Sequence, residues 1–357
     1  MVGIYGLLGL QDGDDTFINT VGQSIVYEAA ETYLQMIDDD MMKAYAVFIE
    51  METEEYKERY KLPGGGRMQE RGRQASNAAV RNYGGWDVAF PLKDFEEPVA
   101  ENDVDVAYMT VRDVQLALDT IQIRNINTWR YEMLKLMFNS AGYTFADKYK
   151  GSLSVVPLAN GDAVTYPPVI GSESEATENH YLESGYASSA ISDTNNPFPV
   201  VRNELEEHTG TPTGFGNVAS FINTAQVAKV EDLTDFDPVE DVNVRSGDQR
   251  DVPINLPMVP GRIIGRCNGV WVVEWRWIPA DYQLSLDLDA PQPIKVRRDP
   301  AATGLQRGLH LAGDSKIHPL YSRHYRNRFG MGVGNRLNGV ALEFGTGGTY
   351  TVPAAFA

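Results

Sequence analysis

The clearest pattern of apolar and polar positions runs from Thr110 to Phe138. Apolar residues recur there at spacings of three and four, which places them on one face of a helix. Thr110 and Asp113 form a capping-box pattern at its start, with Asp in place of the usual Glu. At about 1.5 Å per residue the predicted helix is roughly 40 Å long and suits a spine. Its stripe is Val111, Val114, Leu118 and Ile121, continued after a phase shift at Asn125 to Asn127 by Trp129, Met133 and Leu136.

A second helical pattern extends from Ile25 to Phe48, again with apolar residues three and four apart. Three consecutive aspartates, Asp38 to Asp40, interrupt it, and a division into two helices is one interpretation. The first sixteen or so residues carry glycine and aspartate breaks, which predicts an arm. A further helix is expected at Asn217–Val230, between loops rich in Thr, Pro and Gly.

Alternating positions predict several strands. Trp86, Val88 and Phe90 alternate with polar or small residues. Between Gly261 and Ile278 the residues Trp271, Val273, Trp275 and Trp277 alternate with others, so the indoles are expected on one sheet face. The remaining strand-like segments are the hairpin-like LANGDAVTY, followed near the C-terminus by NGVALEF and TYTVP.

Composition places the chain among ordinary globular proteins, with 43% hydrophobic and 22% charged residues in 357. Roughly two or three compact units are expected at this length. The net charge of −18 argues against a dedicated nucleic-acid binder, because phosphate neutralisation needs excess Lys and Arg. Cys267 is the only cysteine, so no disulfide forms within the chain. The apolar N-terminus lacks a basic n-region, and neither a signal peptide nor a membrane span is expected.

Charge is distributed unevenly along the chain. From Arg59 to Arg81 six basic residues accompany one acid and three consecutive glycines. This segment has too few large apolar residues to offset its own ordering entropy, so it predicts a basic tongue that needs a surface to lie on. An acidic copy of the same chain is the nearest candidate, and protein contact is favoured over RNA binding, for which Tyr60, Tyr83 and Trp86 could provide stacking. The predicted contact residues are Arg59, Lys61, Arg67, Arg71, Arg73 and Arg81.

Acids gather elsewhere. Between Gly171 and Asp251 sixteen Asp and Glu face four Lys and Arg, which indicates a second, loop-rich unit. Lys295–Arg336 is basic again, with nine Lys and Arg against two Asp.

Candidate chemistry is sparse. His310, Asp314, His318 and His324 are close enough in sequence to suggest a metal site, but polar loop residues are the favoured interpretation. FGMGVGNR is not followed by a helix, so its glycines predict a bent strand or a close backbone approach instead of a nucleotide loop. Carboxylate pairs such as Glu206 with Glu207, or Asp235 with Asp237, would suit a glycosidase only across an aromatic-lined cleft. We therefore expect no catalytic residue, cofactor or metal.

The order of elements resembles the major capsid protein of tailed bacteriophages, the Hong Kong-type coat fold also found in encapsulins. The pieces that carry this resemblance are KLPGGGRMQERGRQ for an extended loop, MTVRDVQLALDTIQIRNINTWRYEMLKLMF for a spine helix, and NGVWVVEWRWIPADY with HYRNRFGMGVGNRLNGVALEF for closing strands. The resemblance implies an α+β fold with an N-terminal arm, an extended β-loop, a long spine helix, and peripheral and axial domains.

The resemblance also implies boundaries along the chain. They are an arm at 1–20, a helical segment at 21–50, the extended loop at 51–107, the peripheral domain with the spine helix at 108–170, the acidic axial domain at 171–260, and strands returning through both domains at 261–357.

The implied function is structural: a non-enzymatic subunit that assembles into the icosahedral head of a tailed phage, in the host cytoplasm and then in the virion. Its expected partners are copies of itself in pentamers and hexamers, together with scaffolding, portal and cement proteins. Only a short arm precedes the first helix, so a separate scaffolding protein or a processed chain is expected. Packaged DNA would be faced but not specifically bound, and no membrane is involved. The alternatives are an encapsulin-like compartment shell and a β-rich carbohydrate-active enzyme.

Overall fold

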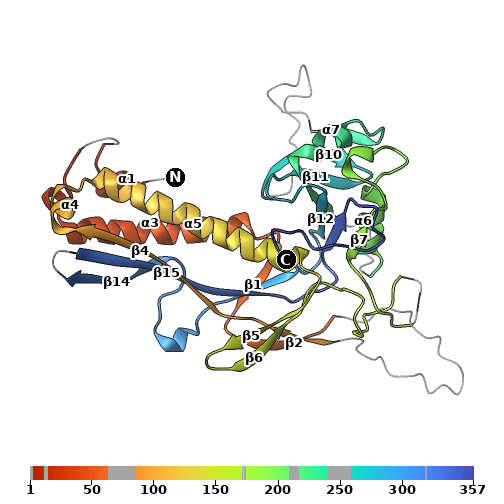
Figure 1. Ribbon diagram of the computed structural model, residues 1–357, viewed down its shortest axis with the longest axis horizontal. Coiled ribbons are helices and arrows are strands. Elements are labelled where there is room, and N and C mark those ends of the chain that lie inside the picture. Colours follow the sequence, from red (N-terminus) through yellow and green to blue (C-terminus); the bar gives the residue numbers. More distant parts are fainter. Residues whose placement is uncertain are drawn as a thin grey trace, which may run out of the picture.

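The computed structural model describes residues 3–11, 15–62, 85–170, 172, 174–208, 217–239, 259–317 and 320–357. Figure 1 shows an elongated lobe, in which long helices lie along long strands, and a more compact lobe at one end of it. The helices are α1 (Ile4–Leu8), α2 (Ile18–Val21), α3 (Gln23–Ala44), α4 (Asp103–Tyr108), α5 (Val111–Phe138), α6 (Phe198–Glu206) and α7 (Val227–Glu231). Short 3-10 turns lie at Ser188–Ala190, Thr224–Gln226 and Ala301–Thr303. No helix among the described residues is long and apolar enough to cross a membrane.

The elongated lobe is built on a five-stranded sheet that α3 and α5 cover (Figure 1). Its longest strand, β15, pairs antiparallel with β4, β13 and β14, while β1 joins β13 in parallel. At the far end of the lobe, α1 and α3 bury apolar side chains against the first half of α5. The strands are β1 (Ile49–Thr53), β4 (Lys93–Asn102), β13 (Ile294–Arg297), β14 (His310–Ile317) and β15 (Leu320–Val333).

The compact lobe contains a seven-stranded sheet in the order β7-β16-β12-β8-β11-β10-β9. Helix α6 packs Phe198, Val201 and Leu205 into the apolar cluster on this sheet. The strands are β7 (Tyr181–Glu183), β8 (Val218–Ile222), β9 (Phe236–Pro238), β10 (Arg262–Cys267), β11 (Val270–Glu274), β12 (Tyr282–Asp287) and β16 (Val340–Glu343).

One apolar core joins the two lobes. Trp129 of α5 stacks on Phe329 of β15 with ring centroids 4.3 Å apart. Phe48, which lies between α3 and β1, contacts both Phe221 of β8 and Trp275. Because such aromatic side chains bury large apolar areas, this shared core is the main link between the sheets.

The predicted spine helix is confirmed, and its start is a capping box. The Asp113 N–H donates to Thr110 Oγ1 at 3.3 Å, and the Thr110 N–H donates to Asp113 Oδ2 at 2.9 Å. The expected phase shift coincides with a buried polar contact, in which Asn327 Nδ2 donates to Asn125 Oδ1 at 2.9 Å. A polar residue therefore interrupts the apolar stripe because β15 supplies its partner.

The division of the second helical pattern at Asp38 to Asp40 is wrong, because α3 is continuous from Gln23 to Ala44. Asp38 is buried, and its carboxylate lies 3.0 Å from the guanidinium of Arg298. Asp39 and Asp40 face solvent. The aspartates thus follow the helical period, one inward to a cation and two outward.

Other expectations need correction. Val218–Ile222, expected to be helical, is the buried strand β8 between β11 and β12, and only Val227–Glu231 forms an α-helix there. A short apolar run buried on both faces has no period that separates strand from helix, which explains the error. TYTVP forms no strand, and the local hairpin is β5 (Tyr143–Asp147) with β6 (Gly151–Val155), not LANGDAVTY.

The glycines of FGMGVGNR lie in and after the end of β15, as a strand with close backbone approach requires. A Cβ built at Gly330 would lie 1.6 Å from the Pro91 carbonyl oxygen, and one at Gly332 would lie 2.6 Å from the Ala89 oxygen. Another backbone therefore crosses β15 where only hydrogen atoms fit, and the prediction is confirmed.

Candidate functional site

The ends of the predicted tongue are held side by side. Strand β2 (Lys57–Tyr60) pairs antiparallel with β3 (Trp86–Ala89), and Tyr60 lies opposite Trp86. The two ends of the predicted tongue therefore lie next to each other on the fold. Of the predicted contact residues, Arg59 and Lys61 are described, whereas Arg67, Arg71, Arg73 and Arg81 lie outside the described residues.

This two-stranded base is fixed to the body. Trp86 Nε1 donates to the Gly334 carbonyl oxygen at 2.9 Å, and its ring stacks on Tyr60 with centroids 5.6 Å apart. Lys295 Nζ, from the five-stranded sheet, lies 2.9 Å from the Glu58 carboxylate of β2. Side-chain contacts thus attach both strands of this base to the rest of the fold.

The two described basic residues present charge at this base. Arg59 is more than half exposed and lies 3.2 Å from Asp87, which also pairs with Lys57 at 2.9 Å. Hydrogen bonds from Lys57 and Arg59 lower the pKa of Asp87. Lys61 is exposed. Arg59 therefore shares one carboxylate with a second cation, and the base retains positive charge.

The elongated lobe exposes apolar side chains on its helices. Leu116 and Ile123 lie seven residues apart on α5, so they share one face, and they are 56% and 60% exposed. Val104 and Tyr108 of the neighbouring α4 are 59% and 71% exposed. Large apolar residues grouped in this way are typical of interaction surfaces.

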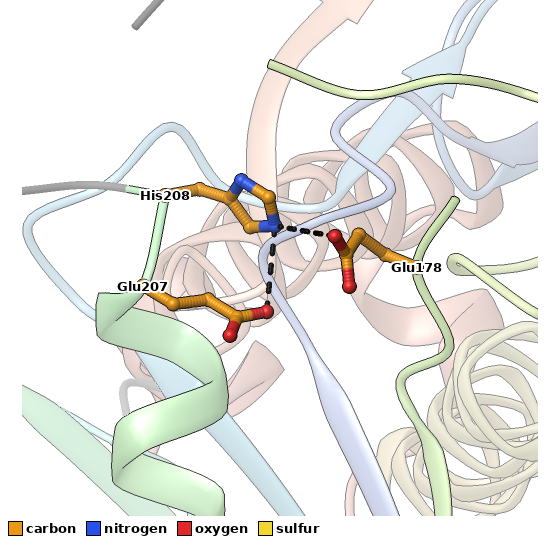
Figure 2. Close-up of side chains that lie close together, drawn as sticks. All are labelled: Glu178, Glu207 and His208. Atoms are coloured by element: carbon orange, nitrogen blue, oxygen red, sulfur yellow. Dashed lines mark ion pairs between the residues drawn. The ribbon is translucent and has the colours of Figure 1, made fainter. Parts of the chain in front are cut away.

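A separate group of ionisable side chains gathers in the compact lobe, where α6 ends. We call Glu178, His180, Glu204, Glu207 and His208 the His–Glu cluster. Glu178, Glu207 and His208 place ligand atoms within 4.8 Å of one another, and His180, Glu204 and Glu207 do the same. Figure 2 shows the His208 ring pointing toward the carboxylates of Glu207, from the end of α6, and Glu178, from the segment before β7.

Burial controls ionisation in the His–Glu cluster. His180 is fully buried, which lowers its pKa to about 4, so the imidazole is neutral at physiological pH. Burial, with Glu207 and Glu178 nearby, raises the pKa of Glu204 to about 7. The carboxyl groups of Glu178, Glu204 and Glu207 therefore lie close enough to repel one another when they are ionised.

Sequence reasoning missed this cluster. Its members lie in two segments that are more than twenty residues apart, and only the fold brings them together. A weak signal did exist, because Glu204, Glu207 and His208 follow the three- and four-residue spacing that puts side chains on one helical face. Glu206, which the sequence pairs with Glu207 as a candidate carboxylate pair, lies 3.1 Å from Arg202 instead.

The other sequence candidates are not assembled into sites within the described part of the chain. His310, Asp314 and His324 form no group of metal-ligand atoms there, and His318 lies outside the described residues. Asp235 accepts a hydrogen bond from Asn268 at 2.9 Å. Trp271 and Trp275 pack on the same apolar core, as a shared face predicts, whereas Trp277 lies beyond the end of β11 with the Arg130 guanidinium 3.7 Å from its ring.

Comparison with known proteins gives matches in structure only. No protein-family model matches the chain, and no curated protein does. A chain from the structure of Mycobacterium phage Patience aligns with a TM-score of 0.66 at 18% identity, over 96% of this chain and 94% of that chain. A chain from the capsid structure of the cyanophage P-SCSP1u aligns with a TM-score of 0.50 at 10% identity, over 83% of this chain and 86% of that one.

An encapsulin from Synechococcus elongatus aligns over 86% of this chain and 90% of that chain at 10% identity. Its TM-score of 0.44 is too low to support an inference. The alignments with the two phage structures cover most of this chain and most of each of theirs. The chain therefore has the Hong Kong-type coat fold of tailed-phage capsid proteins, the fold that its sequence resembles.

Proposed function

We propose that this chain is the structural major capsid protein of a tailed phage, and that it assembles into the icosahedral head that encloses the DNA genome. The observation that carries the proposal is the alignment with the phage structure over nearly the full length of both chains. A fold alone does not imply a function. Here, however, the chain also has an anchored basic loop and exposed apolar helix faces, which suit self-assembly.

The basic tongue is proposed as an intersubunit contact. Arg59, Lys61, Arg67, Arg71, Arg73 and Arg81 would lie on the acidic surface of a neighbouring copy. The paired strands β2 and β3 support this idea, because they hold both ends of the segment on the body. Association would supply the apolar and ionic contacts that the segment cannot make alone.

The domain correspondence is part of the same proposal. The elongated lobe, with α5, would be the peripheral domain, and the compact lobe would be the axial domain that meets its copies in pentamers and hexamers. The described part of the arm, 1–20, is partly tied to its own subunit, because Ile4 and Ile18 are fully buried and the Ile4 N–H donates to Gln115 Oε1 at 2.8 Å. Contacts between the arm and neighbouring subunits would then be made by its remaining residues.

The remaining partners are proposed on the same basis. Scaffolding, portal and cement proteins would join the shell, and the net charge of −18 would leave packaged DNA faced but not gripped. Assembly would occur in the host cytoplasm, without catalytic activity in the subunit. Closed symmetry requires one chain to present different patches to rotated copies, and the loop and helix faces provide such patches.

Negative-stain microscopy of the purified protein tests the proposal. We expect closed shells, or capsomers that close when a scaffolding protein is added. Deleting Leu62 to Arg81 should leave a folded chain by circular dichroism that no longer forms shells. A deletion variant that still closes normal shells would contradict the role of the tongue, and a monomer under all conditions would contradict the proposed function itself.

Charge reversal isolates the electrostatic part of the contact. Arg71→Glu with Arg73→Glu should weaken assembly, and the deficit should depend on salt because exposed charges are screened. Lys43→Glu with Lys229→Glu is the matched control, since Lys43 is exposed and pairs only weakly, at 3.4 Å, with Asp40. Mass spectrometry of the particles separates the encapsulin alternative, which predicts an enclosed enzyme.

A further inference from the structure

The His–Glu cluster has the hydrogen-bond pattern of metal-ligating histidines. His180 Nδ1 lies 2.9 Å from the Gly339 carbonyl oxygen, and His208 Nδ1 lies 2.8 Å from that of Pro167. A carbonyl oxygen only accepts, so Nδ1 carries the proton in both rings. A histidine that binds a metal through Nε2 usually donates its other N–H to such a carbonyl, which fixes the ring and the tautomer.

Both Nε2 atoms are left without a hydrogen-bond partner. His180 is 0% exposed and the His208 side chain is 3% exposed, yet neither Nε2 is bonded. A ring nitrogen of His180 lies within 4.8 Å of oxygens of Glu204 and Glu207. Because unpaired buried polar atoms are costly, each points to a missing group.

The spacing of the donor atoms fits a bound ion. His208 Nε2 lies 3.4 Å from Glu207 Oε1 and 3.6 Å from Glu178 Oε1 (Figure 2), too far for good hydrogen bonds. Two ligands at about 2.0–2.1 Å from a tetrahedral zinc ion are about 3.3–3.4 Å apart. The two distances from the nitrogen are therefore close to the edges of a zinc tetrahedron, and the ligand atoms of all three residues lie within 4.8 Å of one another.

The surrounding field also favours a cation. Glu204 and Glu207 lie in the last turn and at the C-cap of α6, where the helix dipole is negative and acidic side chains are unfavourable. No basic residue lies in that last turn. A divalent cation would offset both the dipole and the mutual repulsion of the carboxylates.

We propose that the His–Glu cluster is a structural site for a divalent transition-metal ion, of which zinc fits best, held by His208, Glu178 and Glu207 with His180 and Glu204 as the nearest further donors. Mixed nitrogen and oxygen donors favour zinc over magnesium or calcium, which prefer oxygen alone. The site differs from the expectation that the chain holds no metal, and it does not depend on the proposed function.

The ion would join two segments that flank different elements of the compact lobe. Glu178 belongs to the segment that leads into β7, whereas Glu207 and His208 follow α6. Binding would therefore stabilise the compact lobe through mass action, by a free energy that grows with the logarithm of the free zinc concentration once it exceeds the dissociation constant.

Calorimetric titration and thermal unfolding test the proposal on the untagged, full-length protein after EDTA treatment. We expect saturable binding of one Zn²⁺ per chain and a rise in the unfolding temperature, with no comparable effect of Mg²⁺. Co²⁺ should give the strong visible absorption of a tetrahedral ion. Absence of saturable Zn²⁺ binding would overturn the proposal.

Variants locate the site. His208→Gln and Glu178→Gln should lower zinc affinity by more than the roughly 10–100-fold lost when a residue that merely orients a ligand is removed. Glu206→Gln is the matched control in the same helical turn, and His324→Gln is the control for surface histidines. His180→Gln risks misfolding because that ring is fully buried, so His208 and Glu178 are the better positions for locating the site. If the cluster variants and the controls bind zinc equally, the site lies elsewhere and the proposal fails.

Discussion

The two sheets of this chain bury polar groups in different ways. The five-stranded sheet buries cationic side chains. Lys295 and Arg297 of β13, and Arg298 just after it, are 4%, 5% and 3% exposed, and each pairs with a carboxylate. The centre of the seven-stranded sheet instead buries neutral groups: Ser220 and Ser285, 2.6 Å apart, and Gln283, which donates to both. The polar groups buried at β13 of the elongated lobe are therefore charged and paired, whereas those in the middle of the compact lobe are neutral.

Burying a charged side chain costs free energy, as Asp38 shows. Burial raises the pKa of Asp38 above its usual value even though Arg298 lies 3.0 Å away. The attraction within the pair thus does not fully offset desolvation of the carboxylate. The pair contributes orientation between α3 and β13 more than net stability.

The largest effect should come from removing one member of that pair. Arg298→Ala leaves Asp38 buried without its cation and also removes the hydrogen bonds to Glu52 and Asn327. We expect the free energy of unfolding to fall by about 3–5 kcal/mol, measured by urea denaturation of the unassembled protein.

The double variant Asp38→Leu with Arg298→Met is the decisive comparison. Apolar side chains of similar size avoid desolvation, so most of the loss should be recovered. If the double variant is as unstable as the single one, the pair contributes net stability to the elongated lobe, and its role is not mainly to orient α3 and β13.

A smaller loss is expected from the neutral network. Ser220→Ala removes the hydroxyl that Ser285 and Gln283 share, which should lower the free energy of unfolding by about 1–3 kcal/mol. The loss should be the same at pH 5 and pH 8, since none of the three groups titrates there. A pH-dependent loss, in the same urea assay, would show that the network couples to a charge.

Acid should act on the elongated lobe. Asp147 is buried, which raises its pKa, but N–H donors from Tyr149 and Lys150 and the Arg297 guanidinium more than compensate, so the pKa is lowered. Its ionised form is favoured on folding, and this contribution is present above the usual carboxyl range and is lost as pH falls through the lowered pKa.

Asp147→Asn should therefore reduce stability modestly at neutral pH and flatten the decline between about pH 5 and pH 2, measured by thermal unfolding across that range. Ser220→Ala serves as the control and should keep the wild-type acid slope. An unchanged slope in Asp147→Asn would show that this carboxylate is not among the groups that make the lobe acid-sensitive.

The smallest effect is expected at the base of the tongue. Asp87→Asn breaks contacts with Lys57 and Arg59, but all three side chains are about half exposed. The free energy of unfolding should change by less than about 1 kcal/mol, because exposed ion pairs contribute little. A loss approaching that of Arg298→Ala would mean that solvent exposure does not separate the two kinds of pair.

Sequence reasoning succeeded where local chemistry decides the structure. The capping residues Thr110 and Asp113 and the apolar stripe that follows them predicted α5, and the glycines of β15 predicted a close backbone approach. It failed where distant partners decide. Asp38 stays in a helix because of Arg298, 260 residues away. Strand β8 has neighbours on both sides that its own five residues cannot reveal.

The same limit applies to the candidate sites. The basic charge of the tongue was visible as composition, but its attachment depends on Trp86 reaching Gly334, 248 residues away. The His–Glu cluster required the end of α6 to meet the segment before β7. Such sites are formed by tertiary contacts between distant segments, so the spacing of residues within one segment does not predict them fully.

The crossing at Gly330 has a mechanical consequence. The chain that returns from the tongue passes over β15 at Pro91, immediately after β3, with no room for even one methyl group. The backbone just before β4 is therefore in direct contact with β15, and any side chain at Gly330 would push the two apart. If the chain assembles as proposed, a side chain at Gly330 would shift the base of the tongue relative to β15 in every copy.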